Sequence, residues 1–455
     1  MADTMRMLQA STALLGLAIV AGCASTQTHS EEAAAAAPAP ASTTAATPQT
    51  TPAASPETPA AAPPPQVAPA PALDFAGWIK AFARQARDAG ISEETLAQTL
   101  EQAQWLPRVV ELDRAQPEFV RPPWVYLDNA VSSLRITQGR KQMQLHAPAL
   151  QAASERYGVP AAIVTAIWGM ESNYGRNFGS FRTVDALATL AFDGRRRSWA
   201  RNELMDALRI VDRGEAAASA LIGSWAGAMG HTQFLPSVYL AYAVDADGDG
   251  RRDIWGSVPD VVASTAHYLE VAGWRSSEPW GTEVQLPAGF DYARAELSTV
   301  QASRDWAGEG VRTPTGAPLP ALEKASILAP AGALGPAVLV GGNFRALLRY
   351  NNSINYALAV ALLAQRIEGG PDLLAPWPRT LAPLTRSEVR SLQQGLNQRG
   401  IDAGTADGVI GPATRAGVRQ LQTALDLQPA DGYPTQALLQ RLRTLPEPEN
   451  GQSSP

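Results

Sequence analysis

The sequence predicts a mainly α-helical protein with a second, smaller helical domain near its C-terminus. Within residues 160–193, apolar side chains recur at the three- and four-residue spacing of a helix, at Ile163, Val164, Ile167, Trp168 and Met170. The same spacing returns near the C-terminus, at Val389, Leu392, Leu396, Val418, Leu421 and Leu425. Between these regions, residues 281–343 gain Gly, Pro and Val and lose the helical period. We therefore expect a small β-containing insertion there, with strands at 284–286 and 337–340.

The N-terminus predicts an export signal. Arg6 precedes an apolar run, residues 13–21, that is too short to span a membrane as a mature helix. Cys23 is the only cysteine, and the three residues before it complete the pattern of a bacterial lipobox. We expect lipidation of Cys23, with an ordinary signal peptide and a stray thiol as the alternative. Because Ala24 follows the cysteine, we expect a lipid anchor at the periplasmic face of the outer membrane.

A tether follows the signal. Residues 24–72 consist almost entirely of Ala, Pro, Thr, Ser and Gln and cannot bury enough apolar surface to fold. At about 3 Å per residue, an extended tether of this length spans on the order of 150 Å. The composition changes divide the chain into a signal peptide (1–23), a tether (24–72), a large helical domain (73–368), a linker (369–380) and a C-terminal domain (381–445).

The large domain opens with several helices. Ser92 precedes two glutamates and is a candidate N-cap. Residues 117–126 are rich in Pro and aromatic side chains, so we expect turns there. Helices are expected to follow at residues 132–142 and 147–157, before the central helix that begins near Pro160.

Glu171 stands at the end of the central apolar run. A carboxyl on the last turn of a buried helix is partly desolvated, and desolvation raises its pKa, as a general acid working near neutral pH requires. A solvated Glu at a helix end is the alternative.

Three sequence blocks resemble the lytic murein transglycosylase B family. They read MESNYGRNFGSFRTVDALATLAFDGRRR from Met170, GSWAGAMGHTQFLPSVYLAYAVDADGDGRRDIW at 223–255, and RYNNSINYALAVALLA at 349–364. The resemblance covers about residues 73–368. It implies a lysozyme-like helical fold that cleaves the β-1,4 bond between MurNAc and GlcNAc in peptidoglycan, with formation of 1,6-anhydro-MurNAc ends.

The resemblance also implies roles for individual residues. Glu171 matches the family's sole catalytic acid/base, and the positions that match substrate-binding residues are Ser224, Gln233, Tyr268, Tyr350 and Tyr356. From the residues alone, turn capping is an alternative for Ser224, and helix packing is one for the tyrosines. A hydrolytic muramidase would need a second carboxylate, for which Asp185 is the nearest downstream candidate.

An acidic loop resembles the start of an EF-hand calcium loop. Asp245, Asp247 and Asp249 occupy its first, third and fifth positions, and Arg251 would offer its carbonyl oxygen. Gly256 replaces the usual twelfth-position Glu, and Asp260 is the expected substitute. We expect no required cofactor and a structural Ca²⁺, with an internally hydrogen-bonded acidic turn as the alternative.

The C-terminal segment resembles a three-helix peptidoglycan-binding module. The resemblance rests on LTRSEVRSLQQGLNQRGI, ADGVIGPATRAGVRQLQTAL and ADGYPTQALLQRL. Within it, Thr414 is a candidate cap of the helix after the DGVIGP loop.

Composition limits the classes of partner. A net charge of −6 and a pI of about 5.4 argue against nucleic acid. The expected partners are peptidoglycan glycan strands, the membrane through the N-terminal lipid, and other cell-wall enzymes. Arginines 195–197 are expected to meet solvent or the anionic stem peptides. A non-catalytic peptidoglycan-binding scaffold remains an alternative to the enzyme.

Overall fold

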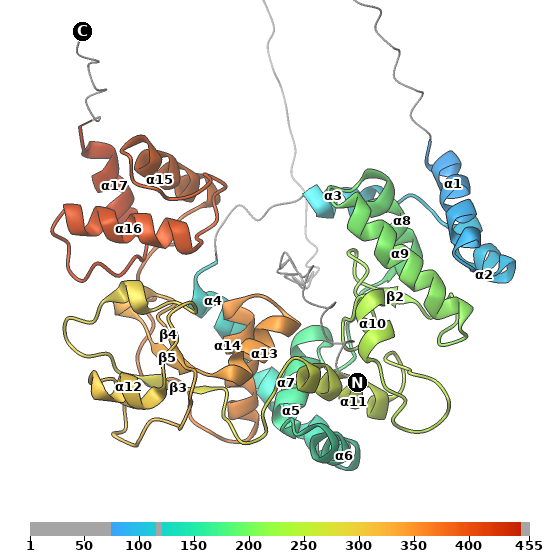
Figure 1. The fold of residues 1–455 in the computed structure, drawn as a ribbon, viewed down its shortest axis with the longest axis horizontal. Helices are drawn as coiled ribbons and strands as arrows, with labels where there is room; N and C mark the ends of the chain where they lie inside the picture. Colours follow the sequence, from blue (N-terminus) through green and yellow to red (C-terminus); the bar gives the residue numbers. More distant parts are fainter. Residues whose placement is uncertain (1–73, 115–120, 447–455) are drawn as a thin grey trace, which may run out of the picture. The chain divides into compact units, whose positions relative to one another are not determined.

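The computed structural model describes residues 74–114 and 121–446, in which helices dominate (Figure 1). The mainly α fold class is confirmed, with short antiparallel strands as the minor component. Among the described residues, no helix combines the length and the hydropathy that a membrane span needs. The predicted signal peptide, the lipidation site Cys23 and the tether lie outside the described residues.

One group of helices surrounds an apolar core built from the N-terminal part of the domain. Its elements are α1 (Phe75–Asp88), α2 (Glu93–Gln98), α3 (Pro107–Arg114), α8 (Thr183–Asp193), α9 (Arg197–Asp212) and α10 (Pro236–Tyr242). Ser92 is the N-cap of α2, as predicted, because its hydroxyl accepts the amide N–H of Thr95 at 3.2 Å. This group includes α8, the helix that follows the central helix in the chain.

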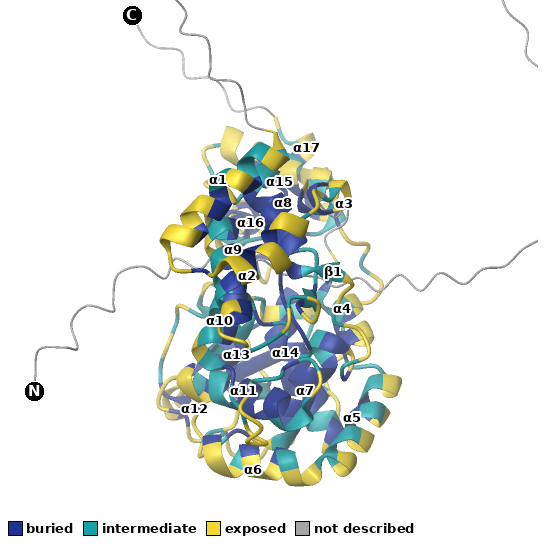
Figure 2. Cartoon of the chain, turned by 90° about the vertical axis from the view of Figure 1, so that its right-hand side faces the viewer, coloured by how far each residue is buried: buried dark blue, intermediate teal, exposed yellow. Residues whose placement is uncertain are grey.

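A second group of helices packs around the central helix α7. Its elements are α4 (Pro123–Ala130), α5 (Ser133–Leu145), α6 (Ala147–Tyr157), α7 (Ala161–Ser172), α11 (Val258–Val271), α13 (Gly342–Tyr350) and α14 (Ile354–Ile367). Figure 2 shows α7 and α14 as the most deeply buried of these. Their many alanines let the two helices approach closely.

One predicted irregular segment is partly helical. Residues 117–126 were expected to form turns, but α4 begins at Pro123. Proline is well suited to the first helical position, because its missing N–H has no partner there. Residues 115–120 lie outside the described part of the chain.

The insertion contains a three-stranded antiparallel sheet in the order β3 (Gly281–Val284), β5 (Ala337–Val340), β4 (Ser326–Leu328). The strand at 337–340 is confirmed. The other predicted strand, 284–286, overlaps β3 only at Val284, because β3 begins three residues earlier, at Gly281. The sheet has its own core around Trp306 in the short helix α12 (Ser303–Gly308). Two further two-residue strands, β1 (Phe181–Arg182) and β2 (Ile222–Gly223), pair antiparallel near α7.

The C-terminal segment forms three helices, α15 (Arg386–Gln398), α16 (Pro412–Ala424) and α17 (Gln436–Thr444), around a separate apolar core. The predicted apolar faces meet there, with Leu425 only partly buried. The prediction for Thr414 is wrong: Gly411 is the N-cap of α16. The Thr414 hydroxyl instead donates to the Ala403 carbonyl at 3.2 Å, because Pro412 already begins the helix.

Candidate active site

The C-terminus of α7 places Glu171. The helix ends at Ser172, because Asn173 and Tyr174 adopt left-handed backbone conformations, with φ of 49° and 59°. The Ser172 hydroxyl accepts the Gly175 amide at 3.0 Å, which closes the turn. Gly169 is needed on the preceding turn, because a Cβ atom there would lie 2.6 Å from the Tyr174 ring. This packing directs the last turn of α7, and Glu171 with it, towards α14.

The side chain of Glu171 is half-buried at the end of α7. Burial raises its pKa to about 7, against the opposing effect of a hydrogen bond from Tyr356. The Tyr356 hydroxyl, on the first turn of α14, donates to Glu171 Oε1 at 2.5 Å. At neutral pH such a carboxyl exchanges readily between its acid and base forms. The raised pKa and the hydrogen bond from Tyr356 agree with the predicted partial desolvation of Glu171, whose side chain is half-buried.

Two tyrosines, Tyr350 and Tyr126, interact electrostatically with this carboxyl. The negative charge of Glu171 contributes to raising the pKa values of Tyr350 and Tyr126, after the larger effect of burial. Asn351 follows Tyr350, and its Oδ1 atom is buried without a hydrogen-bond partner among the described residues. Sequence reasoning missed Tyr126 and Asn351. Asn351 lies within the third family block and could have been found there, but Tyr126 lies outside the matched blocks.

Tyr350 and Tyr268 take part in an aromatic cluster with Phe234. The rings of Tyr268 and Tyr350 meet edge to face with centroids 5.0 Å apart. Both hydroxyls already donate to backbone carbonyls, that of Tyr350 to Thr232 at 2.7 Å and that of Tyr268 to Arg349 at 2.6 Å. The structure therefore favours the packing alternative for Tyr268, whereas Tyr350 combines packing with proximity to Glu171.

Ser224 and Gln233 lie on the turns that follow β2. The Ser224 hydroxyl oxygen accepts the amides of Ala226 and Ala228, at 3.3 and 3.1 Å, which is the turn chemistry named as its alternative. Its own hydrogen can still be donated. The Gln233 side-chain NH₂ donates to the Phe178 and Gly230 carbonyls, at 2.9 and 3.0 Å. This fixes its amide plane and leaves the carbonyl oxygen to accept from a ligand.

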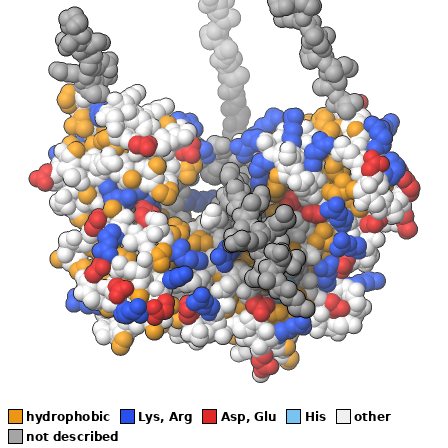
Figure 3. Space-filling view, viewed as in Figure 1, with side chains coloured by type: hydrophobic (Ala, Val, Ile, Leu, Met, Phe, Trp, Pro, Cys, Tyr) orange, Lys and Arg blue, Asp and Glu red, His pale blue; other side chains and the backbone are white. Residues whose placement is uncertain are grey.

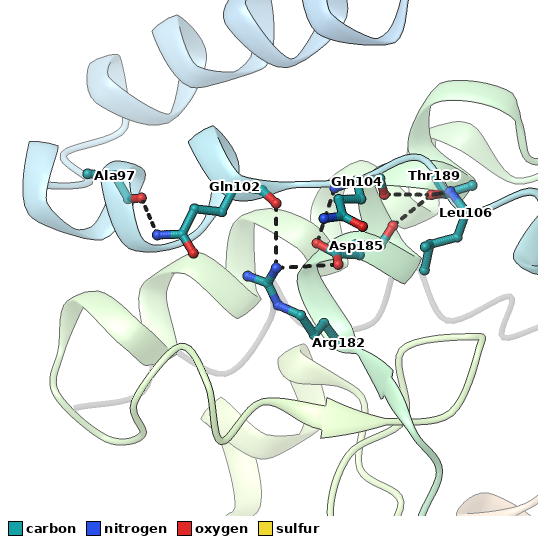
Figure 4. Close-up of polar contacts among 7 residues, drawn as sticks. All are labelled: Ala97, Gln102, Gln104, Leu106, Arg182, Asp185 and Thr189. Carbon is teal, nitrogen blue, oxygen red and sulfur yellow. Dashed lines mark hydrogen bonds and ion pairs between the residues drawn. The ribbon is translucent and has the colours of Figure 1, made fainter.

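Asp185, the candidate second carboxylate, makes structural contacts with neighbouring segments (Figure 4). Its carboxylate lies 3.5 Å from Arg182 and accepts the Gln104 amide at 3.4 Å, on the buried side of α8. Burial raises its pKa, opposed by Arg182. These contacts join α8 to the segment before α3. They assign Asp185 a structural role and give no support to a second catalytic carboxylate.

In the acidic loop, carboxylate oxygens of Asp245, Asp247 and Asp249 all lie within 4.8 Å of one another. Hard oxygen donors converging in this way fit a calcium ion. Asp260, the predicted fourth carboxylate, is not among the three that converge, and its role as a ligand stays a prediction. It is buried, and its two carboxylate oxygens accept backbone amides of Ala246, at 2.7 Å, and of Asp253, at 2.7 Å, so it organises the loop from below.

The loop also has its own hydrogen bonds. Asp245 accepts the amides of Gly248 and Gly250, at 2.7 and 2.9 Å, and Asp249 accepts the amide of Arg251 at 2.8 Å. Internal hydrogen bonds therefore hold the turn in place, and this is the arrangement expected under the alternative of an acidic turn without calcium. Preformed carboxylates also suit a cation, since fewer groups have to reorganise on binding.

Comparison with known families yields two matches. A transglycosylase SLT domain matches residues 74–365, and a peptidoglycan binding domain matches residues 385–442. Membrane-bound lytic murein transglycosylase B of Escherichia coli K12 is 34% identical over 294 residues, which are 61% of this chain and 79% of that protein.

Solved structures agree with these matches. The structure of SltB3 from Pseudomonas aeruginosa in complex with NAG-anhNAM-pentapeptide has a TM-score of 0.79 and 51% identity, and the alignment covers 81% of this chain and 99% of that one. Another crystal structure contains SltB3 with NAG-NAM-pentapeptide. Slt35 of E. coli, in complex with calcium, has a TM-score of 0.55 and 30% identity, covering 65% of this chain and 92% of its own.

Proposed function

Because the chain belongs to the transglycosylase SLT family, and is therefore a lytic transglycosylase of peptidoglycan, we propose that Glu171 supplies both the acid and the base of the reaction. The observation that carries this proposal is the desolvated Glu171 carboxyl, with a pKa of about 7, hydrogen-bonded to Tyr356. A group with this pKa is populated in both protonation states at neutral pH, so one carboxyl can act in both steps.

The proposed reaction proceeds in two proton transfers. Glu171 first protonates the glycosidic oxygen as the bond from that oxygen to MurNAc C1 breaks. The resulting carboxylate then removes the proton of the C6 hydroxyl of the same MurNAc, whose oxygen bonds to C1. The product is 1,6-anhydro-MurNAc, no water is consumed, and the protonated carboxyl is restored. The nucleophile belongs to the sugar itself and so attacks at high effective concentration.

Tyr356 orients the acid in this scheme. Its hydroxyl donates to Oε1 of Glu171, so the transferable proton resides on Oε2. We infer that the Gln233 carbonyl oxygen, the Ser224 hydroxyl and the unpaired Asn351 Oδ1 contact the sugar or its N-acetyl group. Tyr350 lines the same region, with Tyr268 packed behind it.

Digestion of purified murein by the full chain and by Glu171→Gln tests the mechanism, with products analysed by mass spectrometry. We expect ends in anhydro-MurNAc, one water lighter than hydrolytic products, that disappear with Glu171→Gln. Reducing MurNAc ends would contradict the proposal and indicate a muramidase. If the unchanged chain binds murein but does not cleave it, the protein is a non-catalytic peptidoglycan-binding scaffold instead.

We also propose that the acidic loop binds Ca²⁺ as a structural ion. The convergence of Asp245, Asp247 and Asp249 supports this, as does the relative Slt35, which is described in complex with calcium. Thermal unfolding of the full chain with Ca²⁺ and with EDTA tests the proposal, with Asp245→Asn/Asp247→Asn as the matched variant. We expect Ca²⁺ to raise Tm in the unchanged chain only. Equal Tm values with Ca²⁺ and with EDTA would exclude the ion.

For location, we propose that a lipid on Cys23 anchors the chain to the periplasmic face of the outer membrane. The lipobox pattern and the membrane-bound E. coli relative support this. An acyl-mass measurement on Cys23 tests it, and Cys23→Ala is expected in the soluble fraction. Recovery of Cys23→Ala with the membrane would contradict the anchor.

The C-terminal module is proposed to hold the enzyme on its polymer. A chain truncated after residue 380 should keep cleavage of soluble glycan strands but lose sedimentation with intact murein. Substrates carrying stem peptides are included in this proposal, because SltB3 is described with pentapeptide-bearing ligands. Association with other cell-wall enzymes stays a prediction, checked by cross-linking in cells.

A further inference from the structure

A basic cavity lies at the far end of α8 from β1. It encloses about 510 Å³ and opens to solvent. None of the residues placed around Glu171 lines it. Its walls come from the C-terminus of α3 and from the turn between α8 and α9, and its lining includes Arg114, Arg195, Arg196, Arg197 and Trp199. Figure 3 shows Lys and Arg side chains gathered over this end of the helices.

Positive charge exceeds negative charge around the cavity. Arg195 donates to the Asp113 backbone carbonyl and lies 3.5 Å from its carboxylate, so it is paired.

Arg114 is also paired, at 3.2 Å from Asp193. Arg197 has no hydrogen-bond or ion-pair partner within the described residues. Arg196 lies over the Trp199 ring at 4.2 Å, and its Nη2 atom is buried without a partner in that part of the chain. The buried Nη2 of Arg196 therefore lacks a partner, while the exposed Arg197 guanidinium beside it is available to an anion from solution.

The position of these arginines opposes the helix dipole. α9 has 16 residues, begins at Arg197, and has Arg196 as its N-cap without any side-chain cap. The N-terminus of a helix carries partial positive charge and favours anions. The charges of Arg196 and Arg197 repel that partial charge, which opposes the gain from the contact of Arg196 with Trp199. A bound anion would offset both the dipole and the unpaired guanidinium groups.

We propose that this cavity binds the carboxylates of peptidoglycan stem peptides. This inference rests on the proposed action on peptide-bearing glycan. β2 leads directly to Ser224 and pairs with β1, which precedes α8. The 11 residues of α8 extend about 16 Å from there to the cavity. An extended pentapeptide spans about 17 Å, which is similar to the length of α8, and because α8 is buried the peptide of a sugar beside β1 and β2 would run over the surface that covers it towards Arg196.

Binding by the full chain in the Glu171→Gln background tests the proposal without depending on cleavage. The probes are soluble glycan strands with native stem peptides and the same strands with their peptide carboxylates converted to amides. The test variant is Arg196→Gln/Arg197→Gln. The matched control is Arg84→Gln/Arg213→Gln, which removes the same charge from two exposed arginines on α1 and at the end of α9.

We expect the test variant to raise Kd for native strands about tenfold, the effect of losing one charge-assisted contact, and to leave Kd for amidated strands unchanged. The control should bind both strands like the parent. Arg196→Lys/Arg197→Lys should recover part of the affinity, since charge returns without the bidentate fork.

Three results would overturn the proposal. The first is an equal Kd of the test and control variants for native strands. The second is an equal loss of affinity by the test variant for native and for amidated strands. The third is abolition of native-strand binding by millimolar inorganic phosphate at matched ionic strength, which would indicate a general phosphate site. If the active chain gives reducing ends, the proposed mechanism fails, but these binding comparisons still decide the role of the cavity.

Discussion

Removal of the Tyr356 hydroxyl should change the pH range in which the enzyme works. This hydroxyl donates to Glu171 Oε1 at 2.5 Å and opposes the effect of burial, which raises the carboxyl pKa, and the net pKa is about 7. A hydrogen bond to a charged acceptor contributes about 1.5–3 kcal/mol, and one pKa unit corresponds to about 1.4 kcal/mol. Tyr356→Phe should therefore raise the pKa of Glu171 by about one to two units.

The direction of the effect follows from the acid role. Glu171 must be protonated to begin the reaction, so the rate falls as pH rises through its pKa. In the unchanged enzyme, kcat/KM for release of anhydro-muropeptides should decline above pH of about 7. In Tyr356→Phe this decline should move upward by about one to two pH units, at a lower maximal rate, because Glu171 is less well oriented.

The matched control is Tyr239→Phe. Tyr239 is also buried, but its hydroxyl donates to the Arg252 carbonyl, in the other group of helices. This variant should lose stability without any shift of the pH profile. If the basic limb of Tyr356→Phe stays in place or moves to lower pH, the assignment of Glu171 as the acid and of Tyr356 as its hydrogen-bond donor is refuted.

Three further predictions concern stability and the structural residues. The folded pKa of Glu171 lies above its ordinary value of 4.5, so the unchanged chain loses stability as pH rises through 4.5 to 7. Chemical denaturation should therefore give Glu171→Gln a free energy of unfolding about 2–3 kcal/mol higher than that of the unchanged chain at pH 8. At pH 4 the variant should be no more stable than the unchanged chain. Asp185→Asn should cost about 1 kcal/mol and keep anhydro ends in the murein digest; loss of cleavage with an intact fold would restore Asp185 as a catalytic group. Gly175→Ala should lower the free energy of unfolding by about 2–4 kcal/mol, because φ is +78° and the new Cβ would lie 2.3 Å from the His231 ring. Gly214→Ala is the control, since φ there is also positive but nothing lies within 4 Å of the new Cβ, and it should cost only about 1 kcal/mol. Thermal unfolding of both variants measures the difference.

Local sequence determined the helices and indicated the candidate acid. The apolar period of α7, the cap at Ser92 and the helix at 147–157 follow from short-range spacing and capping, which depend on a few neighbouring residues. Glu171 became a candidate because it ends an apolar run, and the resemblance of the surrounding block to the transglycosylase family implied its role as the acid. Its desolvation, and therefore the direction of its pKa shift, followed from the same pattern.

Tertiary structure alone decided how these residues meet. Tyr356 lies 185 residues from Glu171, and no local pattern shows that its hydroxyl reaches the carboxyl. Asp185 and Asp260 are carboxylates whose roles depend on partners from other segments, and those partners make both structural.

The charge on the turn before α9 is visible in the sequence, since three arginines stand there in succession. Which of them is neutralised was not visible, because Asp113 on α3 reaches Arg195 only after α3 packs against α8. Short-range spacing therefore defines the helices and the candidate acid, whereas desolvated contacts between distant segments define which charges are paired and which remain available to substrate.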